Sequence, residues 1–147
     1  MEPSDQKKLN HARQCSRRLA LQALYQWSFT DCDVQELVDQ YQSDEYWPKS
    51  DQEYFSRLVC GSITDVTRLD ALIGKASDYD VTRIDPVELA TLRVAVFELT
   101  NCMETPEKVI ISEAIRLCRK FGSDEGYRLV NVILDTITKS VLRSMFT

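Results

Sequence analysis

Residues 105–135, TPEKVIISEAIRLCRKFGSDEGYRLVNVILD, constrain the fold most strongly, because they predict two helices joined by a tight break. Thr105 is placed to cap the first helix, and Pro106 costs no hydrogen bond in a first turn. Apolar residues then repeat with the spacing of one helical face, at Ile111, Ala114, Ile115 and Cys118. Gly122 ends this helix, and a second helix is expected to start near Ser123.

Asn131 interrupts the apolar run from Leu129 to Leu134, so the pattern predicts that its side chain is buried. A buried amide without hydrogen-bond partners costs about 1–3 kcal/mol. Asn131 is therefore interpreted either as a structural residue that ties two helix ends together or as a direct ligand contact.

Similar apolar stripes recur along the rest of the chain and predict an all-α fold of six or seven helices, arranged as one antiparallel bundle or as two small bundles packed together. The further predicted helices cover residues 12–29, 31–43, 52–73 and 86–100, and the third of them is one long helix or two abutting ones. Ser50 and Glu53 form a capping-box pattern that opens the third of these helices. We expect a single domain, residues 1–147, in which residues 1–11 form a flexible basic arm.

The distribution of charge divides the chain into two basic ends and an acidic middle. The net charge of −5 by itself argues against nucleic-acid binding. However, residues 1–18 hold five cations against two acids, and residues 116–143 hold six against three. Residues 31–55 hold eight acids against Lys49 alone. This pattern indicates two faces that suit two different partners.

The sequence lacks the motifs of catalysis, cofactor binding and metal binding. It has no glycine-rich phosphate loop, no nucleophile elbow and no cluster of histidines and cysteines. The only histidine, His11, lies in the polar arm, and the five cysteines show no C-x-x-C spacing. No apolar run is long enough to span a membrane, and no signal peptide is evident. We therefore expect a non-enzymatic, cytoplasmic protein with reduced thiols, no cofactor and no metal.

Three blocks of sequence, in this order, resemble the NusB family of transcription antitermination factors. They are ALQALYQW at residues 20–27, LRVAVFEL at 92–99, and the series V-x-I-x-E-A-I-x-L, F-G and V-N-x-x-L-D within 109–135. The resemblance implies two perpendicular three-helix bundles. It also implies a factor that binds boxA RNA together with NusE, a small-subunit ribosomal protein, and that joins RNA polymerase to suppress termination on ribosomal RNA operons.

Carried over by resemblance, the RNA-binding residues lie at the two basic ends of the chain. The expected residues are Lys7, Lys8, Arg13, Arg17, Arg18, Tyr25, Tyr127 and Arg128. Arg13 and Arg17 lie four residues apart on one side of a helix, and cations at a helix start oppose the helix dipole, which favours an anionic ligand for them. Arginines attract phosphates, and aromatic rings stack on unpaired bases. Glu88 matches a position implicated in the contact with NusE.

The sequence also departs from the family pattern. Gln14 and Cys15 stand where other members often have arginine, Leu129 replaces the usual phenylalanine, and Val132 replaces glycine. These departures motivate an alternative function, a helical protein-interaction bundle without RNA binding. Homodimers are known in the family, so self-association of the free protein stays open. An RNA methyltransferase that carries a NusB-like domain is not expected, because these residues leave no room for a cofactor domain.

Overall fold

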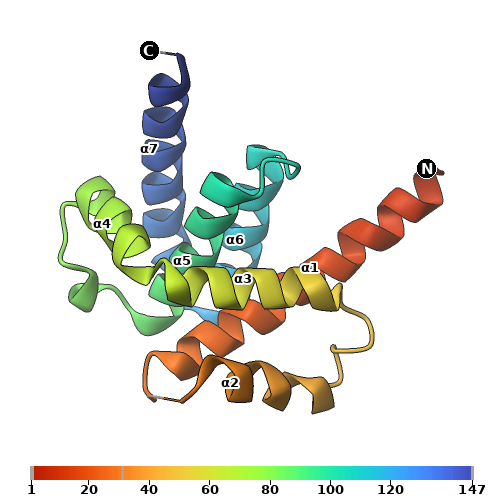
Figure 1. The fold of residues 1–147 in the computed structure, drawn as a ribbon. Helices are drawn as coiled ribbons and strands as arrows, with labels where there is room; N and C mark the ends of the chain where they lie inside the picture. The colour runs from red at the N-terminus through yellow and green to blue at the C-terminus, as the bar shows by residue number, and fades with distance from the viewer. Residues whose placement is uncertain (1, 31, 147) are drawn as a thin grey trace. The chain divides into compact units, whose positions relative to one another are not determined.

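The computed structural model describes residues 2–30 and 32–146, and the side chains up to residue 141. These residues form seven α-helices, two short 3-10 helices and no strand, so the predicted all-α fold is confirmed. The chain divides into two compact units, residues 1–64 (unit 1) and 65–147 (unit 2), where the sequence predicts a single domain (Figure 1). Each unit is described separately below.

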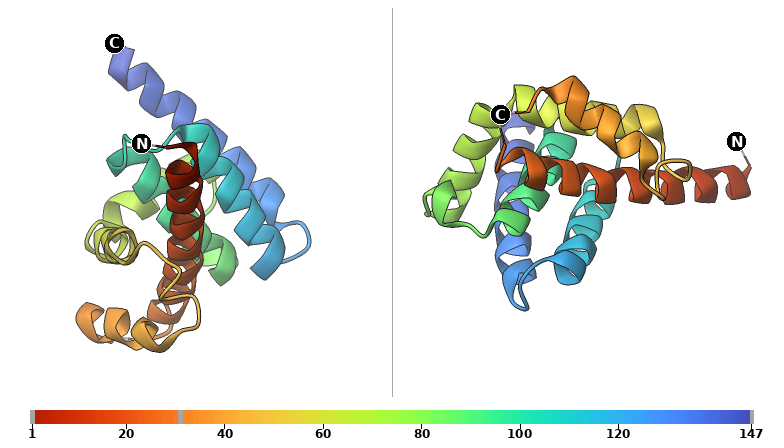
Figure 2. Two further views of the ribbon diagram at one scale, coloured as in Figure 1. Left: turned by 90° about the vertical axis from the view of Figure 1, so that its right-hand side faces the viewer. Right: turned by 90° about the horizontal axis from the view of Figure 1, so that it is seen from below.

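Unit 1 contains three α-helices. They are α1 (Pro3–Trp27), α2 (Val34–Gln40) and α3 (Gln52–Thr64), with the 3-10 helix η1 (Tyr41–Ser43) after α2. Helices α1 and α3 form the main pair, and α2 packs on both. Leu19, Leu24 and Phe55 lie fully buried in this core. Figures 1 and 2 show the first turns of α1 extending beyond α2 and α3.

Helix α1 begins at Pro3, whereas the sequence predicts a flexible arm over residues 1–11. Proline suits a first helical turn, Asp5 complements the dipole there, and the lysines that follow are good helix formers. This segment has no apolar stripe, and it was therefore not recognised as helical. Because α1 starts earlier than predicted, Arg13 and Arg17 are not at a helix start, and the argument from the helix dipole does not apply to them. They lie about 15 Å or more from the start of α1, so the helix dipole does not disfavour them.

Helix α3 is capped by Asp51 and not by the predicted Ser50–Glu53 capping box. The Asp51 Oδ1 atom accepts the Tyr54 backbone N–H at 3.0 Å. The Ser50 hydroxyl instead donates to the Trp47 carbonyl at 2.8 Å. Of the two alternatives for residues 52–73, the structure has two helices, since α3 ends at Thr64 and the next helix starts at Val66.

Unit 2 is built around one nearly fully buried helix. Its elements are α4 (Val66–Ser77), the 3-10 helix η2 (Val81–Arg83), α5 (Pro86–Asn101), α6 (Glu107–Phe121) and α7 (Gly126–Phe146). Helix α5 packs against α4, α6 and α7. As predicted from Asp85 and Pro86, the Asp85 side chain caps α5 by accepting the Val87 N–H at 2.9 Å.

The inward face of α6 differs from the prediction by about one position, whereas the inward face of α7 is the one that its apolar spacing predicts. Buried residues of α6 are Ile110, Glu113, Ala114, Leu117 and Cys118. The N-cap of α6 is Pro106, one residue after the predicted Thr105. In α7 the buried stripe is Val130, Ile133, Leu134 and Ile137. The prediction of a buried Asn131 is wrong, because this residue is exposed. Each residue turns the helix by about 100°, so Asn131 and Val132 lie on its outward side, between the buried Val130 and Ile133.

A pair of hydrogen bonds joins α4 to α5 inside unit 2. Arg93 is 9% exposed and donates from Nε and Nη2 to the two Asp70 carboxylate oxygens, each at 2.9 Å. Bidentate pairs of this kind are stronger than single hydrogen bonds, and their removal in a buried site is destabilising. The pair satisfies the requirement, visible in the sequence, that an arginine in an apolar helix needs a partner.

A double-mutant cycle with Asp70→Asn and Arg93→Met should give a coupling free energy of about 1–3 kcal/mol in urea unfolding. The exposed Asp135–Lys139 pair, at 2.9 Å, is the matched control. The cycle with Asp135→Asn and Lys139→Met should give about 0.5 kcal/mol or less. Equal coupling in the two cycles would show that the Arg93–Asp70 pair has no special role in unit 2.

Candidate nucleic-acid interface

Three arginines of α1 lie over tyrosine rings of unit 1. The Arg13 Cζ atom is 4.4 Å from the centroid of the Tyr54 ring on α3, and Arg17 Cζ is 5.7 Å from the same centroid. Arg18 Cζ is 4.2 Å from the centroid of the Tyr46 ring. These distances are within the range of cation–π attraction. The structure therefore brings together three of the predicted RNA-binding residues.

Two further cations belong to the same surface and were missed in the sequence. Lys49 lies 5.6 Å from the Tyr46 ring centroid, and Arg57 lies 5.9 Å from that of Tyr54. Both residues are exposed. In the sequence, only the spacing of Arg57 three residues after Tyr54 indicates a contact between the two. Lys49 lies within an acidic segment, so nothing there indicates a basic surface. We call Arg13, Arg17, Arg18, Lys49 and Arg57 the α1–α3 basic cluster.

Asp51 anchors this cluster and neutralises part of it. Its Oδ2 atom lies 3.7 Å from Arg13 Nε. The Ser16 hydroxyl donates to the Asp51 carbonyl at 2.7 Å, and the Asp51 N–H donates to the Ala12 carbonyl at 3.2 Å. The start of α3 is thereby fixed against α1, and the guanidinium of Arg13 is held on the ring of Tyr54.

Exposure separates the predicted cations into two groups. Arg17 is 4% exposed, and its Cζ atom lies near the ring of the buried Tyr54. Lys7 and Lys8 are exposed on the projecting first turns of α1. The two lysine side chains are thus accessible to a ligand, whereas Arg17 is buried next to the Tyr54 ring.

Tyr25 lies apart from the α1–α3 basic cluster. It is seven residues after Arg18, which corresponds to about 10 Å along the helix axis. Its side chain is 40% exposed, and its ring makes an edge contact with Phe29 at 5.0 Å between centroids. Phe29 is 63% exposed and was not predicted as a site residue. Together the two rings form an exposed aromatic pair at the end of α1.

The predicted residues Tyr127 and Arg128 lie at the start of α7 in unit 2. Arg128 Cζ is 5.7 Å from the Tyr127 ring centroid, and Arg128 Nε pairs with Glu125 at 2.6 Å. The last turn of α6 adds Arg119, whose Cζ lies 4.2 Å from the Tyr127 centroid. Arg119 is not among the residues that the sequence predicts to bind RNA. Arg119, Tyr127 and Arg128, with the neighbouring exposed Lys120, form the α6–α7 basic cluster.

Glu88, predicted to contact a partner protein, lies inside unit 2 with 1% exposure. Its Oε1 atom accepts hydrogen bonds from the Ser123 hydroxyl at 2.6 Å and from the Ser123 backbone N–H at 3.3 Å. Burial raises the pKa of the Glu88 carboxyl, and its hydrogen bond with Asp85 raises the pKa further. The contact that the structure shows for Glu88 is therefore internal.

Comparison with known proteins assigns the chain to a family. The sequence model of the NusB family matches residues 14–139. The chain belongs to the NusB family. The transcription antitermination protein NusB of Legionella pneumophila (strain Corby) is 42% identical over 126 residues, 86% of each chain. That of Coxiella burnetii (strain Dugway 5J108-111) is 36% identical over 137 residues, 93% of this chain and 99% of its own.

Solved NusB structures share the fold. The structure of T. maritima NusB has a TM-score of 0.79 at 29% identity and covers 86% of this chain and 90% of its own. A crystal structure of NusB and NusE in complex with dsRNA has a TM-score of 0.80 at 23% identity, over 86% of this chain and 96% of its own. The NusB family resemblance drawn from the sequence is therefore confirmed.

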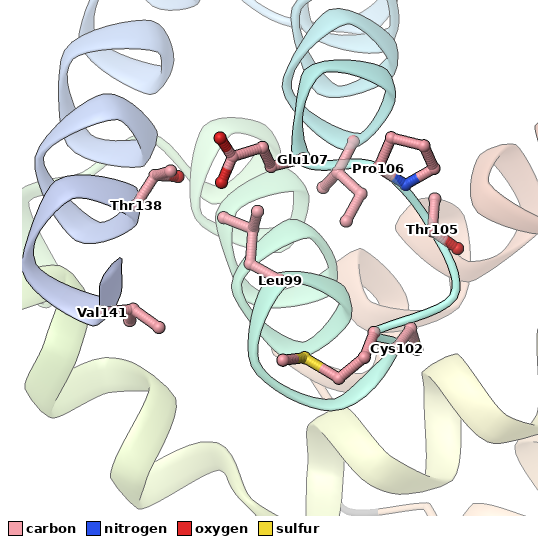
Figure 3. A pocket seen from close by; sticks show the side chains of 9 residues that line it. Leu99, Cys102, Thr105, Pro106, Glu107, Thr138 and Val141 are labelled. Carbon is pink, nitrogen blue, oxygen red and sulfur yellow. The ribbon is translucent and has the colours of Figure 1, made fainter. Parts of the chain in front are cut away.

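In the described residues, no group of histidines, cysteines and carboxylates could hold a metal ion, and no helix is long and apolar enough to cross a membrane. Unit 2 contains a cavity of about 220 Å³ between α5, α6 and α7 (Figure 3). Its lining is mainly apolar, with Glu107 and Thr138 as polar residues next to Leu99 and Val141.

The Cys118 thiol should resist alkylation in the folded protein. Burial and the nearby carboxyls of Glu88 and Asp85 raise its pKa to about 12. At pH 8 about one molecule in ten thousand would carry the reactive thiolate. Mass spectrometry after iodoacetamide treatment should find Cys32, which is partly exposed, labelled and Cys118 unlabelled. In urea both should be labelled. Rapid labelling of Cys118 without urea would contradict its burial beside Glu88.

Proposed function

We propose that this chain is a transcription antitermination factor that binds boxA-type single-stranded RNA as a heterodimer with NusE, a small-subunit ribosomal protein. In this proposal the complex joins RNA polymerase in the cytoplasm and supports transcription of ribosomal RNA operons. The proposal rests on membership of the NusB family and on the chemistry of the two basic clusters. A related NusB has been crystallised with NusE and dsRNA.

The observation that carries the proposal is the α1–α3 basic cluster, in which Arg13 and Arg18 lie over tyrosine rings. A guanidinium stacked on a ring keeps its edge N–H groups available for phosphate oxygens. Stacking also restricts the side chain before a ligand arrives, which lowers the entropy lost on binding. Lys7 and Lys8 extend the positive surface along α1 and add attraction that does not depend on base sequence.

Aromatic rings supply the second component of single-strand recognition. Tyr25 is exposed on α1, and Tyr127 is partly exposed beside Arg119 and Arg128. Stacking of a base on such a ring contributes about 1–3 kcal/mol. We propose that Tyr25 and Tyr127 stack on unpaired bases while Arg128 contacts the RNA backbone.

The acidic segment of unit 1 suits a basic protein partner. Between residues 31 and 55, Asp33, Glu36, Asp39, Glu45 and Glu53 are exposed. Complementary charge of this kind mainly raises the association rate and the specificity of a complex. A ribosomal protein, which is typically basic, would be steered to this surface, and we propose that NusE binds unit 1 in part through it.

The alternative function is a helical protein-interaction bundle without RNA binding. It is favoured by the burial of Arg17, by the contact of Arg13 with Asp51, and by Gln14 and Cys15 in place of arginines. Together these features reduce the number of α1 cations that are available to phosphates. The two functions differ in one measurable property, the salt dependence of RNA binding.

Removal of Lys7 and Lys8 tests the RNA face with little risk to folding, since both side chains are exposed. The double variant Lys7→Ala/Lys8→Ala should weaken binding of a boxA-type RNA in fluorescence anisotropy. It should also reduce the slope of log K against log salt by about 1.4, because a single strand gives about 0.7 per phosphate contact. Titrations with and without NusE, at several salt concentrations, give both numbers.

The control is Lys75→Ala/Lys139→Ala, which removes the same charge from exposed positions on α4 and α7. This variant should keep the wild-type salt slope. An identical loss in both double variants would indicate only a general effect of net charge. Absence of RNA binding by the wild-type chain, even with NusE, would favour the protein-interaction bundle.

A further inference from the structure

The turn between α6 and α7, residues 122–125, is held from inside unit 2 by a buried carboxyl group. Glu88 projects from the first turn of α5 and is 1% exposed. It accepts the Ser123 hydroxyl at 2.6 Å and the Ser123 backbone N–H at 3.3 Å. Among the described contacts, a residue 35 positions earlier in the sequence thus accepts from both hydrogen-bond donors of Ser123.

Two glycines leave the space that this carboxyl group occupies. A Cβ atom added at Gly126 would overlap Oε1 and Cδ of Glu88 and would lie 2.8 Å from its Cγ. At Gly122 an added Cβ would lie 3.3 Å from Glu88 Oε1 and 2.7 Å from the Cys118 carbonyl oxygen. Neither glycine has a positive φ angle. Glycine is therefore needed at these two positions for close approach and not for backbone conformation.

Helix geometry favours a carboxyl group at this place. Glu88 is in the first turn of α5, and it also lies against Gly126, the first residue of α7. Helix N-termini carry partial positive charge from their backbone N–H groups. The Glu88 side chain therefore stabilises the starts of two helices at once.

The same turn sets the relative positions of Arg119 and Tyr127 in the α6–α7 basic cluster. Arg119 is in the last turn of α6, and Tyr127 is the second residue of α7. The 4.2 Å contact between Arg119 Cζ and the Tyr127 ring centroid spans this turn. A change in the path of residues 122–125 would move the ring relative to the guanidinium.

We propose that Glu88 is a positioning residue of the nucleic-acid interface. By binding Ser123 in the space left by Gly122 and Gly126, it sets the α6–α7 turn that brings Arg119 and Tyr127 together. This inference rests on the proposed RNA-binding function. It differs from a direct contact between Glu88 and a protein partner, because the buried side chain acts through Ser123.

The test compares Glu88→Ala, Ser123→Ala, their double variant and Glu88→Gln in the full chain, each checked for folding by circular dichroism. Hydrogen exchange of the backbone amides of residues 122–127 reports the order of the turn. Fluorescence anisotropy with a single-stranded boxA-type RNA reports affinity. The control is Glu107→Ala, which removes an exposed carboxylate from the first turn of α6.

Glu88→Ala should speed exchange at the Ser123 amide about tenfold or more and weaken RNA binding about threefold to tenfold, as expected for loss of a buried hydrogen bond. Ser123→Ala should show smaller changes in exchange and in RNA affinity than Glu88→Ala does. The double variant should show changes no larger than those of Glu88→Ala alone, because both substitutions remove the same interaction. Glu88→Gln keeps the shape and an acceptor oxygen, so it should stay within about twofold of wild type.

The sign of the change in affinity separates positioning from simple charge. Removing a carboxylate reduces repulsion of phosphates, so Glu107→Ala should bind RNA as tightly as wild type or more tightly. Unchanged exchange in Glu88→Ala, or an affinity gain like that of the control, would overturn the inference. If Glu88→Ala does not fold, Ser123→Ala decides the matter, since its side chain lies at the surface and only one hydroxyl is lost.

The two proposals fail in different ways. Faster exchange at the turn, combined with RNA affinity that responds neither to Glu88→Ala nor to Tyr127→Ala, would confirm that Glu88 positions the turn. The same result would refute the role of the α6–α7 basic cluster in RNA binding. Loss of NusE binding in Glu88→Ala, with unchanged exchange at the turn, would instead support a direct protein contact.

Discussion

The burial of α5 is the constraint on which unit 2 depends. This helix packs against α4, α6 and α7, so a polar side chain on it needs a partner within the unit. Arg93 meets Asp70 of α4, and Glu88 meets Ser123 of the α6–α7 turn. Each pair joins α5 to a different neighbour. The polar groups of α5 thus fix the positions of the surrounding elements, while its apolar residues supply the burial that stabilises them.

Unit 1 uses a different solution, in which cations are stabilised by aromatic rings. Arg13 and Arg17 lie over Tyr54, and Asp51 caps the helix that carries this ring. The arrangement resembles the α6–α7 basic cluster, in which Arg119 and Arg128 both lie near the Tyr127 ring. In both clusters a carboxylate lies next to an arginine. The carboxylates therefore neutralise part of the positive charge of each cluster, and the aromatic rings restrict the orientation of the arginine side chains.

Helix type and charge distribution could be predicted from the sequence, because both are local properties. Periodicity predicts an all-α chain, and the basic residues of α1 and α7 can be read directly. The orientation of α6 could not be predicted as reliably, because its apolar residues fit two adjacent faces. In α7, the apolar run around Asn131 gave no sign that Asn131 and Val132 lie on the outward side. The helix over residues 3–11 was missed because it lacks an apolar face. Pairings such as Glu88 with Ser123 join residues far apart in sequence, and no periodic signal reports them.

The burial of Glu88 changes how a motif position should be interpreted. The resemblance to the NusB family implies that this residue takes part in partner binding. The structure shows how a buried residue can affect binding, since Glu88 holds the α6–α7 turn through Ser123. Its carboxyl fills the space at Gly122 and Gly126, so substitutions at any of these positions would alter the same turn. A residue can thus affect binding through the backbone that it holds. In this chain, the exposed carboxylates that we propose for a basic protein partner lie in unit 1, whereas the buried Glu88 contacts Ser123 of the α6–α7 turn.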